Sequence, residues 1–150
     1  MSFRERFTEE EWQVLMGLPA QLLMLTGLAD GEFDPAEREE ANQRLQRAAQ
    51  ADPDPLYREL AAAMFASGTS LMSDVARADP ERCRQLLRDN LTTEEYQHFF
   101  VSVLADGLAV AKASGARRRK PFGPKPDPIS DEEKGVLAAW TRFYGFFELG

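Results

Sequence analysis

Helix-start signals recur along the whole of this 150-residue chain and constrain its fold more than any other feature. Four pairs place a capping residue three positions before a glutamate, so that each side chain can accept the other residue's free backbone N–H. These pairs are Thr8/Glu11, Asp34/Glu37, Thr92/Glu95 and Ser130/Glu133. Two further starts place Asp before Pro, at Asp54-Pro55 and Asp79-Pro80, and proline suits the first turn of a helix.

Strand signals are missing from the same sequence. No stretch alternates apolar and polar residues with a period of two, and β-branched residues are few. We therefore predict an all-α fold, a single bundle of about seven helices. The length suits one domain with a sizeable core, so we expect residues 1–150 to form a single unit.

One uncharged stretch, from Trp12 to Ala29, approaches the length of a membrane span. Pro19 and two glycines interrupt it, so it reads as a short helix, a break and a core helix. The first eleven residues lack the basic-then-apolar order of a signal peptide. These features predict a cytoplasmic protein with no membrane span.

The charge of the chain is acidic but unevenly spread. The formal net charge is −7, which argues against nucleic acid and anionic membranes as partners. Residues 1–75 carry −8 and residues 76–150 carry +1. Many of the basic residues in the second half are concentrated in one run, Arg117, Arg118, Arg119 and Lys120. This run lies inside a Pro/Gly-rich segment at about 115–128 that cannot be helical throughout. This basic insert is either a solvated segment or a binding surface for an anionic partner, such as phosphate or nucleic acid.

Few residues could support catalysis. The chain has one cysteine, Cys83, and one histidine, His98, which excludes an internal disulfide, a thiolate zinc cluster and a multi-His metal site. Cys83 has no base nearby in the sequence, and His98 suits the face of a helix. No phosphate loop, nucleophile elbow or dinucleotide fingerprint occurs. We therefore expect a protein that is not an enzyme. The aromatic residues near the C-terminus, Phe143, Tyr144, Phe146 and Phe147, suit a core or a homodimer surface.

A repeated motif carries the most functional information. Leu28-Ala29-Asp30-Gly31 reappears as Leu104-Ala105-Asp106-Gly107. Each copy is followed by an apolar residue, a capping residue and a glutamate three positions after the cap, and the second copy reaches them after twenty extra residues. The chain therefore contains two loosely repeated halves.

The motif has a purely structural explanation as well as a functional one. Gly31 suits the end of a helix, and Glu37 and Glu133 suit capping boxes. Asp30 would face the negative end of a helix dipole, which requires compensation by N–H groups or a cation. For Asp106, the apolar spacing continues past Gly107, so the helix either ends there or continues. A continuing helix would set Asp106 beside an apolar stripe, where it needs a partner.

The order apolar helix, Ala-Asp-Gly, apolar residue, cap and glutamate, occurring twice, resembles the tellurite-resistance TerB-like family. The resemblance covers roughly residues 12–147. It implies a bacterial all-helical protein connected with tellurite resistance or general stress responses. It further implies a divalent metal ion bound by acidic residues near the two Asp-Gly turns, which here are Asp30, Glu37, Asp106 and Glu133. The sequence does not distinguish among Ca²⁺, Mg²⁺, Mn²⁺ and Zn²⁺. The alternative is a protein–protein interaction module that uses the basic insert, with purely structural acidic turns.

Overall fold

The computed structural model describes residues 2–28, 34–68, 70–117 and 131–144. Every regular element in these ranges is helical, which confirms the all-α fold. A short 3₁₀ helix, η1 (Phe3–Arg6), precedes eight α-helices. They are α1 (Glu9–Met16), α2 (Leu18–Leu28), α3 (Pro35–Ala51), α4 (Pro55–Ala66), α5 (Leu71–Arg77), α6 (Pro80–Asn90), α7 (Thr93–Arg117) and α8 (Asp131–Tyr144).

The capping residues predicted from the sequence precede the helices that the structure describes. Thr8 and Asp34 form complete capping boxes with Glu11 and Glu37. Thr92 and Glu95 exchange the same pair of hydrogen bonds, at 2.9 and 3.2 Å. Asp54 and Asp79 cap α4 and α6 with proline in the first turn, and Ser130 lies outside the described residues.

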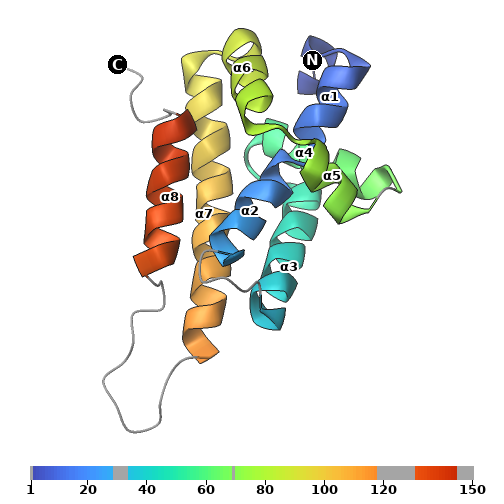
Figure 1. Ribbon diagram of the computed structural model, residues 1–150. Coiled ribbons are helices and arrows are strands. Elements are labelled where there is room, and N and C mark those ends of the chain that lie inside the picture. The colour runs from blue at the N-terminus through green and yellow to red at the C-terminus, as the bar shows by residue number, and fades with distance from the viewer. Residues whose placement is uncertain (1, 29–33, 69, 118–130, 145–150) are drawn as a thin grey trace, which may run out of the picture.

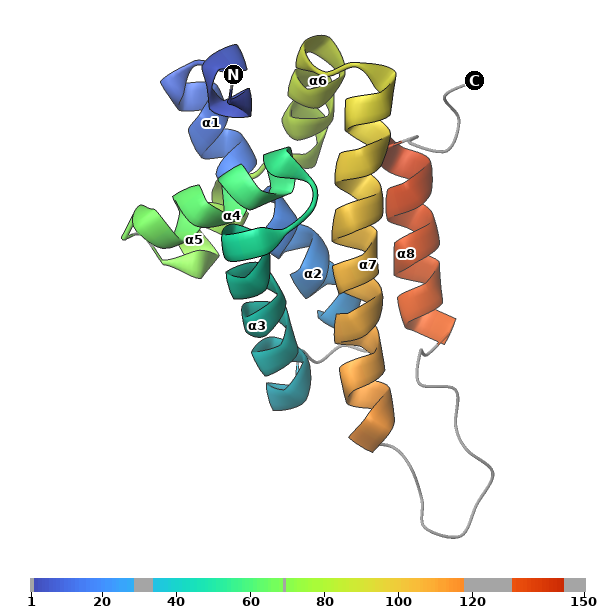
Figure 2. The same ribbon diagram turned by 180° about the vertical axis from the view of Figure 1, so that it is seen from behind.

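The long helix α7 forms the axis of the bundle (Figure 1). Helices α2 and α3 pack against it, and α8 lies beside it at one edge of the molecule. The view from behind shows α4 on the far side of α7 from α8 (Figure 2). The outer face of α8 therefore has no neighbouring helix among the described elements.

Helix α2 lies in the centre of the bundle because its residues carry no charge. It contacts α3, α5, α7 and α8, and a helix that is apolar on all sides is stable only when it is covered. Leu18, Leu22 and Leu23 are at most 1% exposed. The buried Thr26 hydroxyl donates to the Leu22 carbonyl oxygen at 2.9 Å, so it needs no other partner. The sequence reading of Trp12–Ala29 as two helices is confirmed, and no described helix is long and apolar enough to cross a membrane.

Aromatic side chains fill the core beside α7. Phe99 and Phe100 are completely buried, and the Phe100 ring centroid lies 4.6 Å from that of Tyr144 on α8. Tyr144 is 2% exposed, whereas its neighbour Phe143 is 37% exposed. The end of α8 therefore supplies one core aromatic residue and one surface aromatic residue; Phe146 and Phe147 lie outside the described residues.

The two Asp-Gly copies occupy different contexts. The first copy begins at Leu28, the last residue of α2, and its Asp30 and Gly31 lie outside the described residues. The second lies in the middle of α7, which continues through Gly107 to Arg117. Of the two possibilities left open for Asp106, the structure shows the continuing helix. Helix α7 also includes residues 115–117 at the start of the predicted basic insert, and residues 118–128 of that insert lie outside the described residues. A Cβ on Gly107 would meet Thr26 and Trp140 at 3.5 Å, an ordinary packing distance.

Candidate functional site

The first acidic turn is described from Asp34 onward, and Asp30 lies outside the described residues. The Asp34 carboxylate accepts the Glu37 backbone N–H at 2.8 Å, and the Glu37 carboxylate accepts the Asp34 N–H at 3.3 Å. Glu37 is 1% exposed. The predicted capping box is therefore correct, and its glutamate is an acidic side chain held inside the fold.

Asp106, the candidate ligand of the second copy, has protein partners. Its carboxylate accepts a hydrogen bond from the Tyr57 hydroxyl at 2.6 Å, and an Arg44 guanidinium nitrogen lies 3.7 Å from its other oxygen. Burial raises the pKa of Asp106, while the Tyr57 hydrogen bond and the Arg44 charge oppose that shift. The expectation that a mid-helix Asp106 needs a partner is confirmed, and the partners come from α4 and α3.

Tyr57 connects Asp106 to the corner between α3 and α4. The Tyr57 side chain is completely buried, and its backbone N–H donates to the Asp54 carboxylate at 2.9 Å. The Asp54 N–H in turn donates to Asp52 at 2.8 Å. Burial raises the pKa of both Asp52 and Asp54. The Asp54 carboxylate therefore accepts the backbone N–H of Tyr57, and the Asp106 carboxylate accepts its hydroxyl, at the place where α3, α4 and α7 meet.

Sequence reasoning missed this corner in part. It identified Asp54 as a cap but overlooked Tyr57, which comes three positions after the cap and so donates its N–H to it. No local signal connects Tyr57 with Asp106, because they lie 49 positions apart in the chain.

Of the four proposed cation ligands, the structure describes the side chains of Glu37 and Asp106. Within the described ranges, no three His, Cys, Asp or Glu side chains are arranged to hold a metal ion. Asp30 lies outside those ranges, and Glu133 stands in the first turn of α8 without a described side chain. Of the basic run, Arg117 is the last residue of α7, and Arg118, Arg119 and Lys120 lie outside the described residues.

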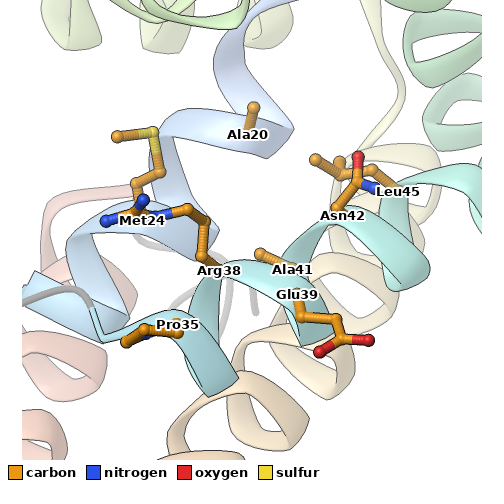
Figure 3. Close-up of a pocket in the computed structure, with 8 residues that line it drawn as sticks. All are labelled: Ala20, Met24, Pro35, Arg38, Glu39, Ala41, Asn42 and Leu45. Atoms are coloured by element: carbon orange, nitrogen blue, oxygen red, sulfur yellow. The ribbon is translucent and has the colours of Figure 1, made fainter.

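A hollow of about 400 Å³ lies next to the first turn of α3. Ala20 and Met24 of α2 form one wall, and residues of α3 form the rest (Figure 3). The α3 lining residues are Pro35, Arg38, Glu39, Ala41, Asn42 and Leu45. The hollow combines apolar side chains with the charged side chains of Arg38 and Glu39.

The single thiol does not offer a nucleophile. Cys83 is completely buried, and burial raises its pKa to about 12. Thiols react as thiolates, so at neutral pH this group is inert. His98 is exposed on α7, in agreement with its interpretation as a helix-face histidine.

Comparison with known proteins found no match to any family model, curated protein or solved structure. The TerB-like resemblance therefore depends on the repeated motif alone.

Proposed function

We propose that the protein is a non-enzymatic binding protein of TerB-like type, connected with bacterial stress responses. Its cation site is the first Ala-Asp-Gly turn, between α2 and α3, with Asp30 and Glu37 as ligands. The observation that supports this proposal is the 1% exposure of Glu37 at the start of α3. Carboxylate oxygens are the ligands that hard divalent cations prefer, and Glu37 holds such a group inside the fold, seven positions after the second proposed ligand, Asp30.

The proposal uses one copy of the motif rather than two. Asp106 already accepts the Tyr57 hydroxyl and faces Arg44. Glu133 belongs to the first turn of a separate helix, after the insert. Asp30 and Glu37, by contrast, lie only seven positions apart in the sequence.

A thermal melt with and without Ca²⁺, Mg²⁺, Mn²⁺ and Zn²⁺ tests the proposal. A metal that binds the native state at about one hundred times its dissociation constant raises the midpoint by about 5–10 °C for a chain of this size. Asp30→Asn should abolish the shift. Asp106→Asn is the matched control, because it also neutralises the Asp of a Leu-Ala-Asp-Gly motif, and it should keep the shift. If none of the four metals shifts the midpoint, the proposed cation site is rejected.

A second candidate is the protein–protein interaction module with the basic run as its surface. It is favoured by the capping roles of Asp34 and Glu37, which give the first acidic turn a structural purpose. Deletion of residues 118–127 should abolish capture of a partner from a bacterial extract while leaving the melting midpoint unchanged. Unchanged capture would reject this candidate.

A further inference from the structure

An apolar groove of about 240 Å³ runs between α2 and α8, beside the start of α6. Its lining residues are Gln21, Leu22 and Leu25 of α2, Pro80 of α6, and Val136, Ala139, Trp140, Phe143 and Tyr144 of α8. None of these residues is charged. Leu25 is 43% exposed and Phe143 is 37% exposed, so the groove opens to solvent along its rim. A surface of this kind suits a neutral molecule better than an ion.

Three of the residues that line this groove carry a buried polar atom with no hydrogen-bond partner in the part of the chain that the structure describes. These atoms are Oε1 of Gln21, Nε1 of Trp140 and the hydroxyl oxygen of Tyr144. Trp140 is 4% exposed and Tyr144 is 2% exposed. Buried polar atoms are nearly always paired in folded proteins, and an apolar groove with a few polar groups is typical of a small-molecule site.

Two of these atoms lie at the α6 end of the groove. The Gln21 side-chain nitrogen donates to the Ala78 carbonyl oxygen at 2.7 Å, directly before α6 begins, and Oε1 belongs to the same amide group. Burial raises the pKa of the Tyr144 hydroxyl, and the Cys83 thiol of α6 raises it further, so this hydroxyl also lies near the start of α6. Trp140 comes one helical turn before Tyr144 and shares its face of α8.

The three atoms together define the chemical group that would pair them. Oε1 of Gln21 can only accept a hydrogen bond, the Trp140 indole N–H can only donate one, and the Tyr144 hydroxyl can donate one. A hydroxyl group has one O–H donor and two lone pairs, so it can donate to Gln21 and accept from the other two. A carboxylate or phosphate could not donate to Gln21, and an ammonium group could not accept from Trp140. The set therefore favours a neutral hydroxyl group.

The volume of the groove limits the size of its ligand. An apolar cavity of about 150 Å³ binds one benzene molecule, so about 240 Å³ has room for one ring with a short substituent. Trp140 and Phe143 supply aromatic contacts, which favour an aromatic ring. We propose that the groove between α2 and α8 binds a small neutral compound with one aromatic ring and one hydroxyl group, with the hydroxyl at the α6 end. This proposal depends on neither the cation site nor the basic insert.

An NMR titration of the wild-type chain with para-ethylphenol and with ethylbenzene tests the site. The two compounds share the ring and the ethyl group, and only para-ethylphenol has a hydroxyl. The chain has two tryptophans, Trp12 and Trp140, whose indole N–H signals a Trp12→Phe variant assigns. Para-ethylphenol should shift the Trp140 signal to saturation and leave that of Trp12, on α1, in place. Ethylbenzene should bind at least about fivefold more weakly, because it forms no hydrogen bond.

Tyr144→Phe tests recognition of the hydroxyl. The change removes a group without a hydrogen-bond partner among the described residues, so the melting midpoint should not fall. Affinity for para-ethylphenol should fall about fivefold, and affinity for ethylbenzene should stay the same. A purely structural role of the hydroxyl would instead lower the midpoint and leave the ratio of the two affinities unchanged, which would overturn its assignment to the site.

Ala139→Phe tests the location of the site. Ala139 is exposed and lines the groove, so a larger side chain there occupies the ligand's volume and should abolish binding of both compounds. Ala138→Phe is the matched control, because Ala138 is also exposed but is not among the lining residues, and this variant should bind normally. Circular dichroism checks that both variants keep the wild-type helix content.

Three results would overturn the proposal. The first is that neither compound shifts the Trp140 signal of the wild-type chain. The second is equal affinity for para-ethylphenol and ethylbenzene, which would remove the role of the hydroxyl. The third is equal binding by the Ala139→Phe and Ala138→Phe variants, which would place the bound compound outside this groove.

Discussion

Tyr57→Phe removes one hydroxyl from the corner where α3, α4 and α7 meet. The ring remains the same size, so the packing against Phe99, with ring centroids 6.4 Å apart, is preserved. The change deletes the 2.6 Å hydrogen bond to Asp106 and leaves that carboxylate with Arg44 at 3.7 Å. The Asp106 side chain is only 13% exposed, so water replaces the lost donor poorly.

The magnitude depends on the charge of the acceptor. A hydrogen bond to a charged group contributes about 1.5–3 kcal/mol, and we expect a loss of about 2 kcal/mol from the free energy of unfolding. For a chain of this size that loss lowers the melting midpoint by about 4–8 °C. Urea unfolding followed by circular dichroism measures the free energy directly.

The pH dependence has a defined sign. Burial raises the pKa of Asp106 and the Tyr57 hydrogen bond lowers it, so Tyr57→Phe raises that pKa further. The variant should therefore lose most stability at neutral pH, where Asp106 is ionised. The loss should shrink as the pH falls through the raised pKa, because a neutral carboxyl group forms a weaker hydrogen bond.

A double-mutant cycle separates this bond from other effects. In an Asp106→Asn background the Tyr57→Phe change should cost much less than in the wild type, since the charged acceptor is gone. A loss below about 0.5 kcal/mol at neutral pH, or an equal loss in both backgrounds, would refute the assignment of the bond as a stabilising contact.

Three further outcomes are expected. Gly17→Ala should cost about 3 kcal/mol of unfolding free energy, because its Cβ would clash with a backbone carbonyl oxygen of α5. Gly107→Ala should instead stabilise the helix, because its Cβ has ordinary neighbours at 3.5 Å. Equal effects of the two changes in urea unfolding would contradict both expectations. Cys83 should react with a thiol reagent at neutral pH only in denaturant, because its thiol is buried and its pKa is raised to about 12. Rapid labelling of the native chain would argue against that burial. Arg6 lowers the pKa of Glu95 to about 2, so this ion pair stabilises the fold above the ordinary glutamate pKa, and its contribution disappears as the pH falls toward 2. Arg6→Ala should therefore lose less stability than the wild type over this pH range in acid unfolding. A stability profile identical to that of the wild type would reject the contribution of this pair.

The sequence predicted those features of the fold that depend on neighbouring residues. A cap and its glutamate lie three positions apart, so Thr8/Glu11 and Asp34/Glu37 could be recognised without tertiary information. The position of Gly17 could not be assessed, because its lack of a side chain matters only where α5 approaches within contact distance. The same limit applies to the Tyr57–Asp106 bond, which joins helices distant in the chain.

The two Leu-Ala-Asp-Gly copies differ because different residues come after them. After Gly31 the chain continues with Glu32, Phe33 and the Asp34 cap, which starts a new helix. After Gly107 it continues with apolar residues at helical spacing, so α7 has core contacts to make and does not end. Asp106 consequently lies on a packed helix face, where burial makes an uncompensated carboxylate costly and Tyr57 and Arg44 supply the compensation. The residues that follow this tetrapeptide therefore decide the role of its aspartate. Neutralising Asp30 and Asp106 in parallel separates a role as a metal ligand from a role in packing.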